Sequence, residues 1–242
     1  MSLNGEKILP REWRWALIGD IVRESQSGFA CGERDTDGAI QLRMNNVTTN
    51  GTFNWNELTR VPKNIDNLNK FQLLPGDVIF NNTNSTELVG KSALFSGHEE
   101  TIVYSNHFTR LRVYENQCDG AYLSFWLNNL WFGKVFEDIC NRWIGQSAIK
   151  LDKLLSLKIP LPPLPEQKRI TTILSFLNDG FKLEAPYSGP YLGQQFSELP
   201  QDVQDDIILA YDIDFNEAKG LPEEELREVY SRVNKYLVAL NR

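Results

Sequence analysis

Short apolar runs separated by polar clusters dominate the chain from Trp13 to Ile159. The runs are rich in β-branched and aromatic residues, and Gly, Asn and Asp lie between them, which predicts short strands joined by turns. The predicted strands are Ala39 to Leu42, Asp77 to Phe80, Thr101 to Tyr104, Phe108 to Val113 and Leu157 to Ile159. In the run from Phe108, alternation places Arg110 and Arg112 on one face of the strand and Thr109, Leu111 and Val113 on the other.

Two other segments follow the period of an α-helix. From Ala121 to Cys140, apolar residues recur every three or four positions and predict one amphipathic helix with a weak point at Gly133. Its aromatic residues follow helical period, which favours a core face over a platform for stacking bases. A second stripe runs from Glu223 to Leu240. That stripe must be buried, either on the preceding domain or against a second copy of the chain, and amphipathicity does not distinguish the two.

A proline-rich stretch connects the last predicted strand to another helix. Pro160, Pro162 and Pro163 exclude helix and fix an extended backbone, whereas Pro165 is placed to open a helix that has Glu166 in its first turn. The Asn-Asp-Gly sequence that begins at Asn178 predicts the end of this helix. Composition alone favours a plain linker, and also allows a ligand for an aromatic groove. The local sequence does not decide between these and a rigid elbow.

Charge is distributed unevenly along the 242 residues. The net charge is −7, yet residues 1–178 contain 19 Lys or Arg and 19 Asp or Glu, whereas residues 179–242 contain 6 and 13. The acidic excess therefore belongs to the C-terminal segment. A neutral domain can bind DNA through a locally basic face, but its unaided affinity for nonspecific DNA should be weak. The chain is long enough for one good core and a small second unit.

The cysteines and histidines indicate no metal site and no nucleophile. Three widely spaced cysteines, Cys31, Cys118 and Cys140, form neither a disulfide framework nor a metal knuckle, so burial as small apolar groups is expected. His98 and His107 are the two histidines, and neither belongs to a nucleophile motif. We also find no glycine-rich phosphate loop. The sequence therefore predicts no cofactor, no metal and no catalytic activity of its own.

One set of residues invites comparison with restriction nucleases. Asp77, Glu87 and Lys91 superficially resemble metal-binding carboxylates followed by a lysine. In those nucleases the lysine follows the acid by two residues on one strand, whereas here the gap is four and a turn-like Leu-Val-Gly sequence interrupts it. We interpret the similarity as chance.

Several motifs resemble, in order, those of DNA specificity subunits of type I restriction-modification systems. The closing motif, Ile-Pro-Leu-Pro-Pro-Leu-Pro-Glu-Gln-Lys-Arg-Ile at residues 159–170, is the most specific of them. The resemblance covers about residues 13 to 178. The other motifs are Trp15 to Ile21 with Gly28, Ile40 to Val47, Leu74 to Phe80, Val89 to Ala93 and Gly145 to Ile149.

The resemblance implies a fold and a division of the chain. It predicts an α+β target-recognition domain of short strands with packed helices at residues 13–164, and a shortened conserved-region helix at residues 165–179. An acidic helical segment of unknown role follows at residues 180–242. Members of the family have two recognition domains spaced by long paired helices, whereas this chain shows one domain and no internal repeat. It is expected to act as half a subunit.

The resemblance also implies partners. The chain would read double-stranded DNA and direct a type I methyltransferase subunit and a nuclease/translocase subunit to a target sequence, with catalysis in those partners. Two copies could form a homodimer through their C-terminal helices. A cytoplasmic location without membrane contact is expected, since no apolar run is long enough to cross a bilayer. The alternative is a noncatalytic interaction or regulatory protein derived from a recognition domain, which binds protein through its acidic tail.

Polar loops supply the side chains that read base edges. Arg suits guanine, Asn and Gln suit adenine, and Ser and Thr are adaptable; Asn-rich runs are equally typical of ordinary turns. Lys91, Arg110 and Lys150 are expected to hold phosphates. The candidate DNA-binding residues are Arg43, Asn45, Asn46, Asn82, Asn84, Ser85, Lys91, Arg110, Arg142, Gln146, Ser147 and Lys150. The resemblance implies partner-binding residues at the start of the helix: Pro165, Glu166, Gln167, Arg169 and Ile170.

Overall fold

The computed structural model describes residues 9–178, with side chains as far as Thr171. The chain divides into one unit at Met1–Gln167 and another at Lys168–Arg242. Within the described residues, the first unit contains the strands and all of the helices before α5. The described part of the second unit is the rest of helix α5, from Lys168 to Asn178. The predicted helix from Glu223 to Leu240 lies outside the described residues.

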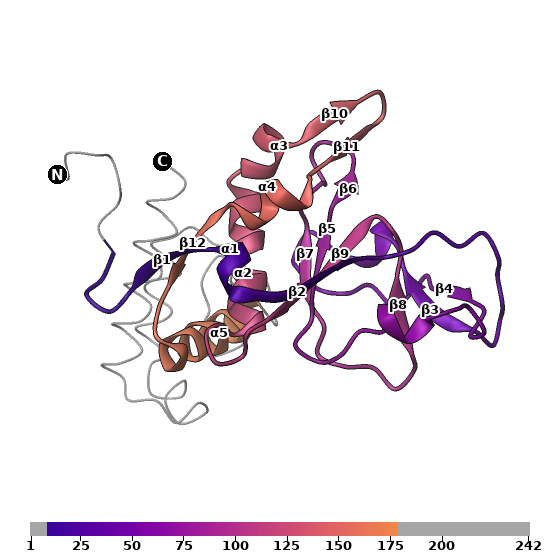
Figure 1. Cartoon of the computed structure of the whole chain (residues 1–242), viewed down its shortest axis with the longest axis horizontal. Helices are drawn as coiled ribbons and strands as arrows, with labels where there is room; N and C mark the ends of the chain where they lie inside the picture. The colour runs from indigo at the N-terminus through magenta and orange to yellow at the C-terminus, as the bar shows by residue number, and fades with distance from the viewer. Residues whose placement is uncertain (1–8, 179–242) are drawn as a thin grey trace, which may run out of the picture. The chain divides into compact units, whose positions relative to one another are not determined.

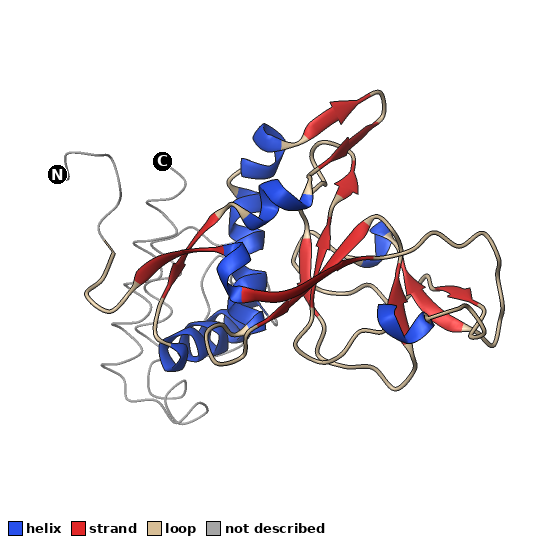
Figure 2. Ribbon diagram, in the orientation of Figure 1, coloured by secondary structure: helices blue, strands red, loops and turns tan. Residues whose placement is uncertain are grey.

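Four small sheets make up the first unit over residues 9–167 (Figures 1 and 2). The largest has the order β2-β9-β5-β7, with strands Val22–Ser27, Phe108–Val113, Val78–Asn81 and Ser92–Leu94. A second has the order β4-β3-β8, with strands Thr59–Val61, Ala39–Leu42 and Ile102–Tyr104. The others are β10-β11-β6, with Asn141–Trp143, Gln146–Ala148 and Thr83–Asn84, and β1-β12, with Arg14–Leu17 and Lys158–Leu161.

The helices are short, except for α2 and α5. Helix α2 packs against β5 and β7, and its N-cap residue Asp119 accepts hydrogen bonds from the backbone N–H groups of the first turn. The α-helices are α1 (Ile18–Ile21), α2 (Gly120–Phe132), α3 (Val135–Ile139), α4 (Leu151–Leu155) and α5 (Leu164–Asn178), with 3-10 helices η1 (Met44–Asn46) and η2 (Leu68–Phe71).

The predicted helix from Ala121 to Cys140 is two helices in the structure. The break lies at Gly133 and Lys134, and Lys134 has a left-handed backbone with φ +60°. This turn redirects the chain, so that Phe136 is fully buried and meets the ring of Phe80 edge to face at 5.2 Å. The Phe136 ring also explains why residue 90 is a glycine, because a Cβ atom there would lie 2.3 Å from the ring. Gly90 also has φ +96°, a backbone conformation that favours glycine.

The five predicted strands agree well with the structure, and Arg110 and Arg112 share one face of β9 as predicted, since both pair with Glu24. The bounds of β9 are Phe108–Val113 as predicted, and five of its six residues are buried. Both faces of the strand are covered, because η2 and the segment after it lie over the face that carries Arg110. A core of aliphatic and aromatic residues from the two larger sheets includes Ile40, Ile79 and Phe108.

The proline-rich connection is a rigid elbow. Strand β12 pairs with β1, and side chains of α2 satisfy two of its carbonyls: Tyr122 Oη donates to Pro160 O at 2.6 Å and Trp126 Nε1 donates to Lys158 O at 3.1 Å. Helix α5 then begins at Leu164 and extends through Asn178, the last described residue. Buried Tyr122 and Trp126 of α2 therefore hold the elbow, whereas Phe132 of the same helix is 61 % exposed and lies outside the predicted core face.

The three cysteines form no disulfide bonds. All three cysteines are free thiols, of which Cys118 is buried while Cys31 and Cys140 are half-buried. Burial raises the pKa of Cys118 to about 12, so the thiol stays protonated at neutral pH. Within residues 9–178, no helix is long and apolar enough to cross a membrane.

Candidate nucleic-acid interface

Three of the predicted polar loops leave the sheets at the same end. Strands β5 and β9 are antiparallel with Asn81 opposite Phe108, so the loop after β5 lies beside the turn before β9. Strands β3 and β8 are parallel, and Ser105 N donates to Leu42 O at 2.9 Å, so Arg43 follows its strand next to that same turn. We call this region, made of residues 43–46, 82–86, 105–107 and 141–150, the Asn81 end.

The buried side chain of Asn81 joins two of these loops. Its Nδ2 donates to Thr83 O at 3.0 Å and to His107 O at 2.9 Å, while its Oδ1 accepts from Asn84 Nδ2 at 2.6 Å. Asn82 adds a backbone bond to His107 O and a side-chain bond to Thr109 Oγ1. The loops are thus fixed before any ligand arrives, which lowers the entropic cost of binding.

The hairpin of β10 and β11 projects from this end (Figure 1). Its base is attached to the loop after β5, because β11 pairs with β6 and Ile149 N donates to Asn82 O at 2.9 Å. Thr86 Oγ1 and Ser147 Oγ are 2.7 Å apart in a further side-chain bond. The third predicted loop is therefore a supported β-ribbon at the Asn81 end.

Eight of the predicted DNA-binding residues lie here on accessible or partly accessible surface, and Asn82, Asn84 and Ser85 are the half-buried ones. Asn84 is half-buried and already bonded to Asn81. Asn45 Nδ2 makes a long 3.4 Å contact with Glu57, and Arg142 Nη2 donates to Glu137 O at 2.8 Å, which leaves most of both polar groups accessible. The exposed members are Arg43, Asn45, Arg142, Gln146 and Lys150.

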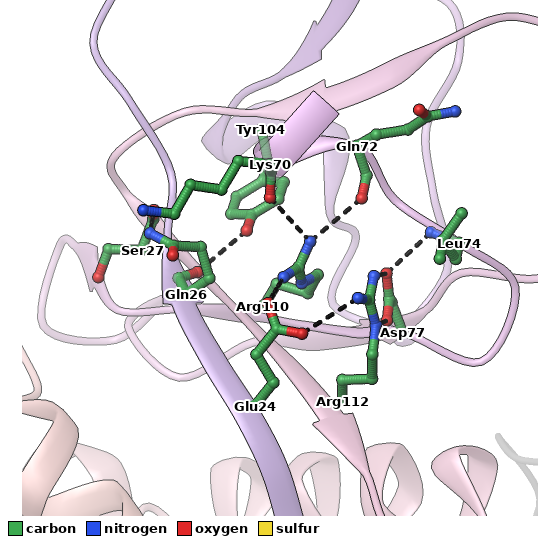
Figure 3. Close-up of polar contacts among 10 residues, drawn as sticks. All are labelled: Glu24, Gln26, Ser27, Lys70, Gln72, Leu74, Asp77, Tyr104, Arg110 and Arg112. Carbon is green, nitrogen blue, oxygen red and sulfur yellow. Dashed lines mark hydrogen bonds and ion pairs between the residues drawn. The ribbon is translucent and has the colours of Figure 1, made fainter. Parts of the chain in front are cut away.

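Arg110 and Lys91 were predicted to hold phosphates, and the structure places both inside the domain. Arg110 is 2 % exposed; its guanidinium pairs with Glu24 and donates to Lys70 O at 3.1 Å and Gln72 O at 3.2 Å (Figure 3). Lys91 is 6 % exposed and donates to Val47 O, and burial lowers its pKa. Neither cation can reach a phosphate while it keeps these partners, so both are removed from the candidate interface.

The same correction applies to Asn46 and Ser147, which are each 1 % exposed. Asn46 Oδ1 accepts from Arg43 N, and its Nδ2 donates to the carbonyls of Asn54 and Glu57, so it shapes the loop that presents Arg43. The turn-forming interpretation of the Asn-rich runs thus holds for Asn46 and for Asn82. Ser85 is half-buried, and its carbonyl accepts from the backbone N–H groups of Leu88 and Val89.

The predicted partner-binding residues have mixed surroundings. Gln167 is fully buried: its Nε2 donates to Gln117 O and Pro162 O, and its Oε1 accepts from Asp119 N at 2.9 Å. It joins the elbow to the start of α2 and is not available to another protein. Glu166 accepts from Trp13 Nε1 at 3.0 Å. Pro165 and Arg169 are exposed, and Ile170 is 3 % exposed.

Sequence reasoning missed the turn between β8 and β9 and the tip of the hairpin. Asn106 is exposed and His107 half-buried, and burial together with the nearby Arg43 cation lowers the pKa of His107. At the tip, Trp143 is 60 % exposed and Ile144 is 106 % exposed. A turn signal at Gly145 was visible, but only the strand register shows which side chains surround it.

The structure does not bring the nuclease-like residues Asp77, Glu87 and Lys91 together. Within residues 9–178, no group of three or more His, Cys, Asp or Glu side chains could hold a metal ion. Asp77 is buried and paired with Arg112, and Lys91 bonds to Val47, so the nuclease-like trio does not converge. The fold and the Asn81 end together define an α+β domain that presents exposed polar loops and a β-ribbon on one side.

Comparison with known proteins identifies the family. The family described as "Type I restriction modification DNA specificity domain" matches residues 18–186. A putative type I restriction enzyme MjaX specificity subunit from Methanocaldococcus jannaschii is 29% identical over 168 residues, which are 69% of this chain and 40% of the relative. The type I restriction enzyme MjaVIII specificity subunit of the same organism is 26% identical over 181 residues, 71% of this chain and 40% of the relative. This chain belongs to the type I restriction modification DNA specificity domain family.

Solved structures of the same kind share the fold. The HsdS subunit from Thermoanaerobacter tengcongensis has a TM-score of 0.51 at 18% identity and covers 88% of this chain and 51% of that one. The S subunit from M. genitalium has a TM-score of 0.50 at 15% identity and covers 74% and 41%. The mixed α/β architecture of short strands and few helices matches these subunits. The chain spans about two fifths of the length of the relatives from M. jannaschii (40% of each).

Proposed function

We propose that this chain is the sequence-reading component of a type I restriction-modification system. Its single recognition domain reads a short DNA half-site through the Asn81 end, and partner subunits carry out methylation and cleavage. Family membership supports the role and favours it over that of an interaction protein derived from a recognition domain. The observation that carries the proposal is the convergence of three separate loops and a β-ribbon, with exposed Arg43, Arg142, Gln146 and Lys150, on one end of the sheets.

The chemistry of this end suits duplex DNA. The forked N–H donors of an arginine and the side-chain amides of asparagine and glutamine match base edges in the major groove, and a two-stranded ribbon fits the width of that groove. Accessible Lys150 and Arg43 can neutralise phosphates, although the described unit carries no large excess of positive charge. We therefore expect modest affinity for the chain alone and tighter binding when a methyltransferase subunit supplies further phosphate contacts.

We further propose that the elbow and the first turns of α5 bind that methyltransferase subunit. Pro165 and Arg169 are exposed on α5, whereas Gln167 serves the domain's own structure. Two copies, joined through C-terminal helices, would read two copies of the half-site. Sedimentation of the complex at several concentrations tests this part, and a single copy per complex throughout would contradict it. A cytoplasmic location follows from the proposed substrate and partners.

The test of the DNA-binding proposal is selection from a randomised duplex pool at low salt, with and without the methyltransferase subunit. We expect enrichment of a defined half-site. The double variant Arg142→Ala/Gln146→Ala should lose the sequence preference and keep methyltransferase binding, because both side chains lie on the ribbon. Arg23→Ala is the matched control: this exposed arginine lies near the Val113 end of β9, where it makes a long 3.9 Å pair with Glu115. No enrichment in either condition, or equal loss in both variants, would contradict the proposal.

A further inference from the structure

The tip of the β10–β11 hairpin combines apolar and amide side chains in an unusual way for a surface turn. Trp143 pairs with Gln146 across the two strands, so Ile144 and Gly145 form a two-residue turn. Gly145 has φ +78°, a conformation that favours glycine. Ile144 is fully exposed and Trp143 is 60 % exposed. Adjacent apolar side chains at a projecting, polar-rimmed site mark a contact surface more often than scattered exposed residues do.

Cross-strand pairing fixes which side chains share a face. Trp143 and Gln146 are direct partners and therefore project from the same face of the ribbon, whereas Arg142 pairs with Ser147 on the other face. Ser147 is buried and bonds to Thr86, so the second face packs against the domain at that position, whereas Arg142 stays exposed. At the tip, the face with Trp143 and Gln146, together with Ile144 at the turn, is the one presented to a ligand.

Duplex DNA is the occupant that the surroundings favour. The ribbon lies at the Asn81 end beside the other polar loops, and exposed Lys150 follows β11 directly. In the major groove a thymine presents a C5-methyl group and its adenine partner presents N6 and N7, which an amide can bond in a bidentate manner. An indole and an aliphatic side chain next to a glutamine amide match that pair of groups.

We propose that this tip reads a thymine-containing base step in the major groove. Ile144 and Trp143 contact thymine C5-methyl groups, and Gln146 bonds the edge of an adenine. The inference rests on the proposed DNA recognition and adds to it the chemical identity of the bases read by the ribbon.

The experiment replaces thymine by uracil, which removes the methyl group and keeps the base pairing. Each thymine of the enriched duplex is replaced in turn, and binding by the complex of the chain with its methyltransferase subunit is measured by fluorescence anisotropy. At one or two positions the wild-type complex should bind the uracil duplex about fourfold more weakly, the effect of one lost methyl contact. The variant Trp143→Ala/Ile144→Ala should bind both duplexes equally and more weakly than the wild type binds thymine.

Leu74→Ala is the matched control for the loss of an exposed apolar side chain. Leu74 is 47 % exposed and precedes β5 at the end opposite Asn81, so its variant should keep the full uracil effect. Because Trp143 and Ile144 are exposed, the double variant should fold normally, which circular dichroism checks.

Three results would overturn the inference, and they are distinguishable. An enriched site that tolerates uracil at every thymine, or one that contains no thymine, would refute it while the proposed function stands. Weakened methyltransferase binding by the Trp143→Ala/Ile144→Ala variant, with unchanged uracil effects, would assign the tip to a protein contact. Failure of the wild-type complex to enrich any sequence would overturn the proposed function itself.

Discussion

Two pairs of arginines in this domain have different roles. Within β9, Arg110 and Arg112 are held by the carboxylates of Glu24 and Asp77, and the group is largely buried (Figure 3). Arg112 donates from Nε and Nη2 to Asp77 at 2.6 and 2.8 Å, and this bond raises the pKa of Arg112. At the Asn81 end, Arg43 and Arg142 are exposed. The first pair is committed to the fold, whereas the second pair remains available to a ligand.

On this domain, the charge of a side chain indicates a possible contact with a ligand only when the side chain is also exposed. Asp77 also accepts from Leu74 N at 2.8 Å, and burial raises the pKa of Tyr104, which stays protonated and donates to Gln26 O at 3.1 Å. These bonds join β2, β5, β8 and β9 around the buried guanidinium groups. A buried ion pair of this kind adds little net stability over apolar packing, but it is costly to break.

Breaking the buried group should have the largest effect. Arg112→Ala leaves the Asp77 carboxylate, which is 1 % exposed, without its bidentate cation, and should lower the free energy of unfolding by about 3–5 kcal/mol. Urea denaturation measures this. Arg23→Ala, which removes a long surface pair with Glu115, should cost no more than about 1 kcal/mol. If both variants lowered the free energy of unfolding by similar amounts, the buried pair of Arg112 and Asp77 would be no more costly to break than a surface pair.

Asn81→Ala should affect stability and recognition together. It removes the amide that bonds Thr83 O, His107 O and Asn84 Nδ2. The expected cost is about 1–3 kcal/mol because Thr83 O loses this donor, while His107 O keeps only the bond from Asn82 N. Since the same amide positions two loops of the Asn81 end, sequence preference in the DNA selection should also weaken. A variant that unfolds more easily yet keeps full preference at low temperature would separate the two roles and contradict our interpretation.

Lys150→Ala should leave the free energy of unfolding nearly unchanged and alter the salt dependence of DNA binding. Loss of one phosphate contact lowers the slope of log K against log salt by about 1. Lys91→Ala serves as the contrast, since Lys91 is buried against Val47 O and should affect stability and not the slope. If Lys91→Ala changed the slope and Lys150→Ala changed only the free energy of unfolding, this assignment of the two lysines would be wrong.

The smallest expected effect concerns pH and His107. Burial and the Arg43 cation lower the pKa of His107 below 6.5, so His107 takes up a proton less readily in the folded domain than in the unfolded chain. The neutral His107 therefore has its full effect on the free energy of unfolding above pH 6.5. This effect is lost as the pH falls through the lowered pKa of His107. DNA phosphates that neutralise Arg43 would raise this pKa, and proton uptake should strengthen binding by up to about threefold between pH 7.5 and 6. His107→Gln should abolish this dependence and His98→Gln should keep it.

Local pattern was enough to predict five of the twelve described strands and the two longest helices. The bounds of β3 and β9 follow from alternation and flanking turns, and the extended stretch before α5 follows from the backbone limits of proline. The same information did not show that Lys134 adopts a left-handed conformation and divides the long helix, because that depends on the burial of Phe136 against Phe80.

By itself, the sequence determined five of the twelve described strands, the extended proline-rich stretch before α5, the neutral charge of residues 1–178 and the order of motifs that marks the family. Only the tertiary structure decided which polar residues are exposed. Alternation assigns Arg110 to a face of its strand, but η2 covers that face, and Asn46 and Ser147 are likewise enclosed by neighbouring segments. Burial depends on contacts between residues far apart in the chain, such as Arg110 with Glu24, and no local spacing records them.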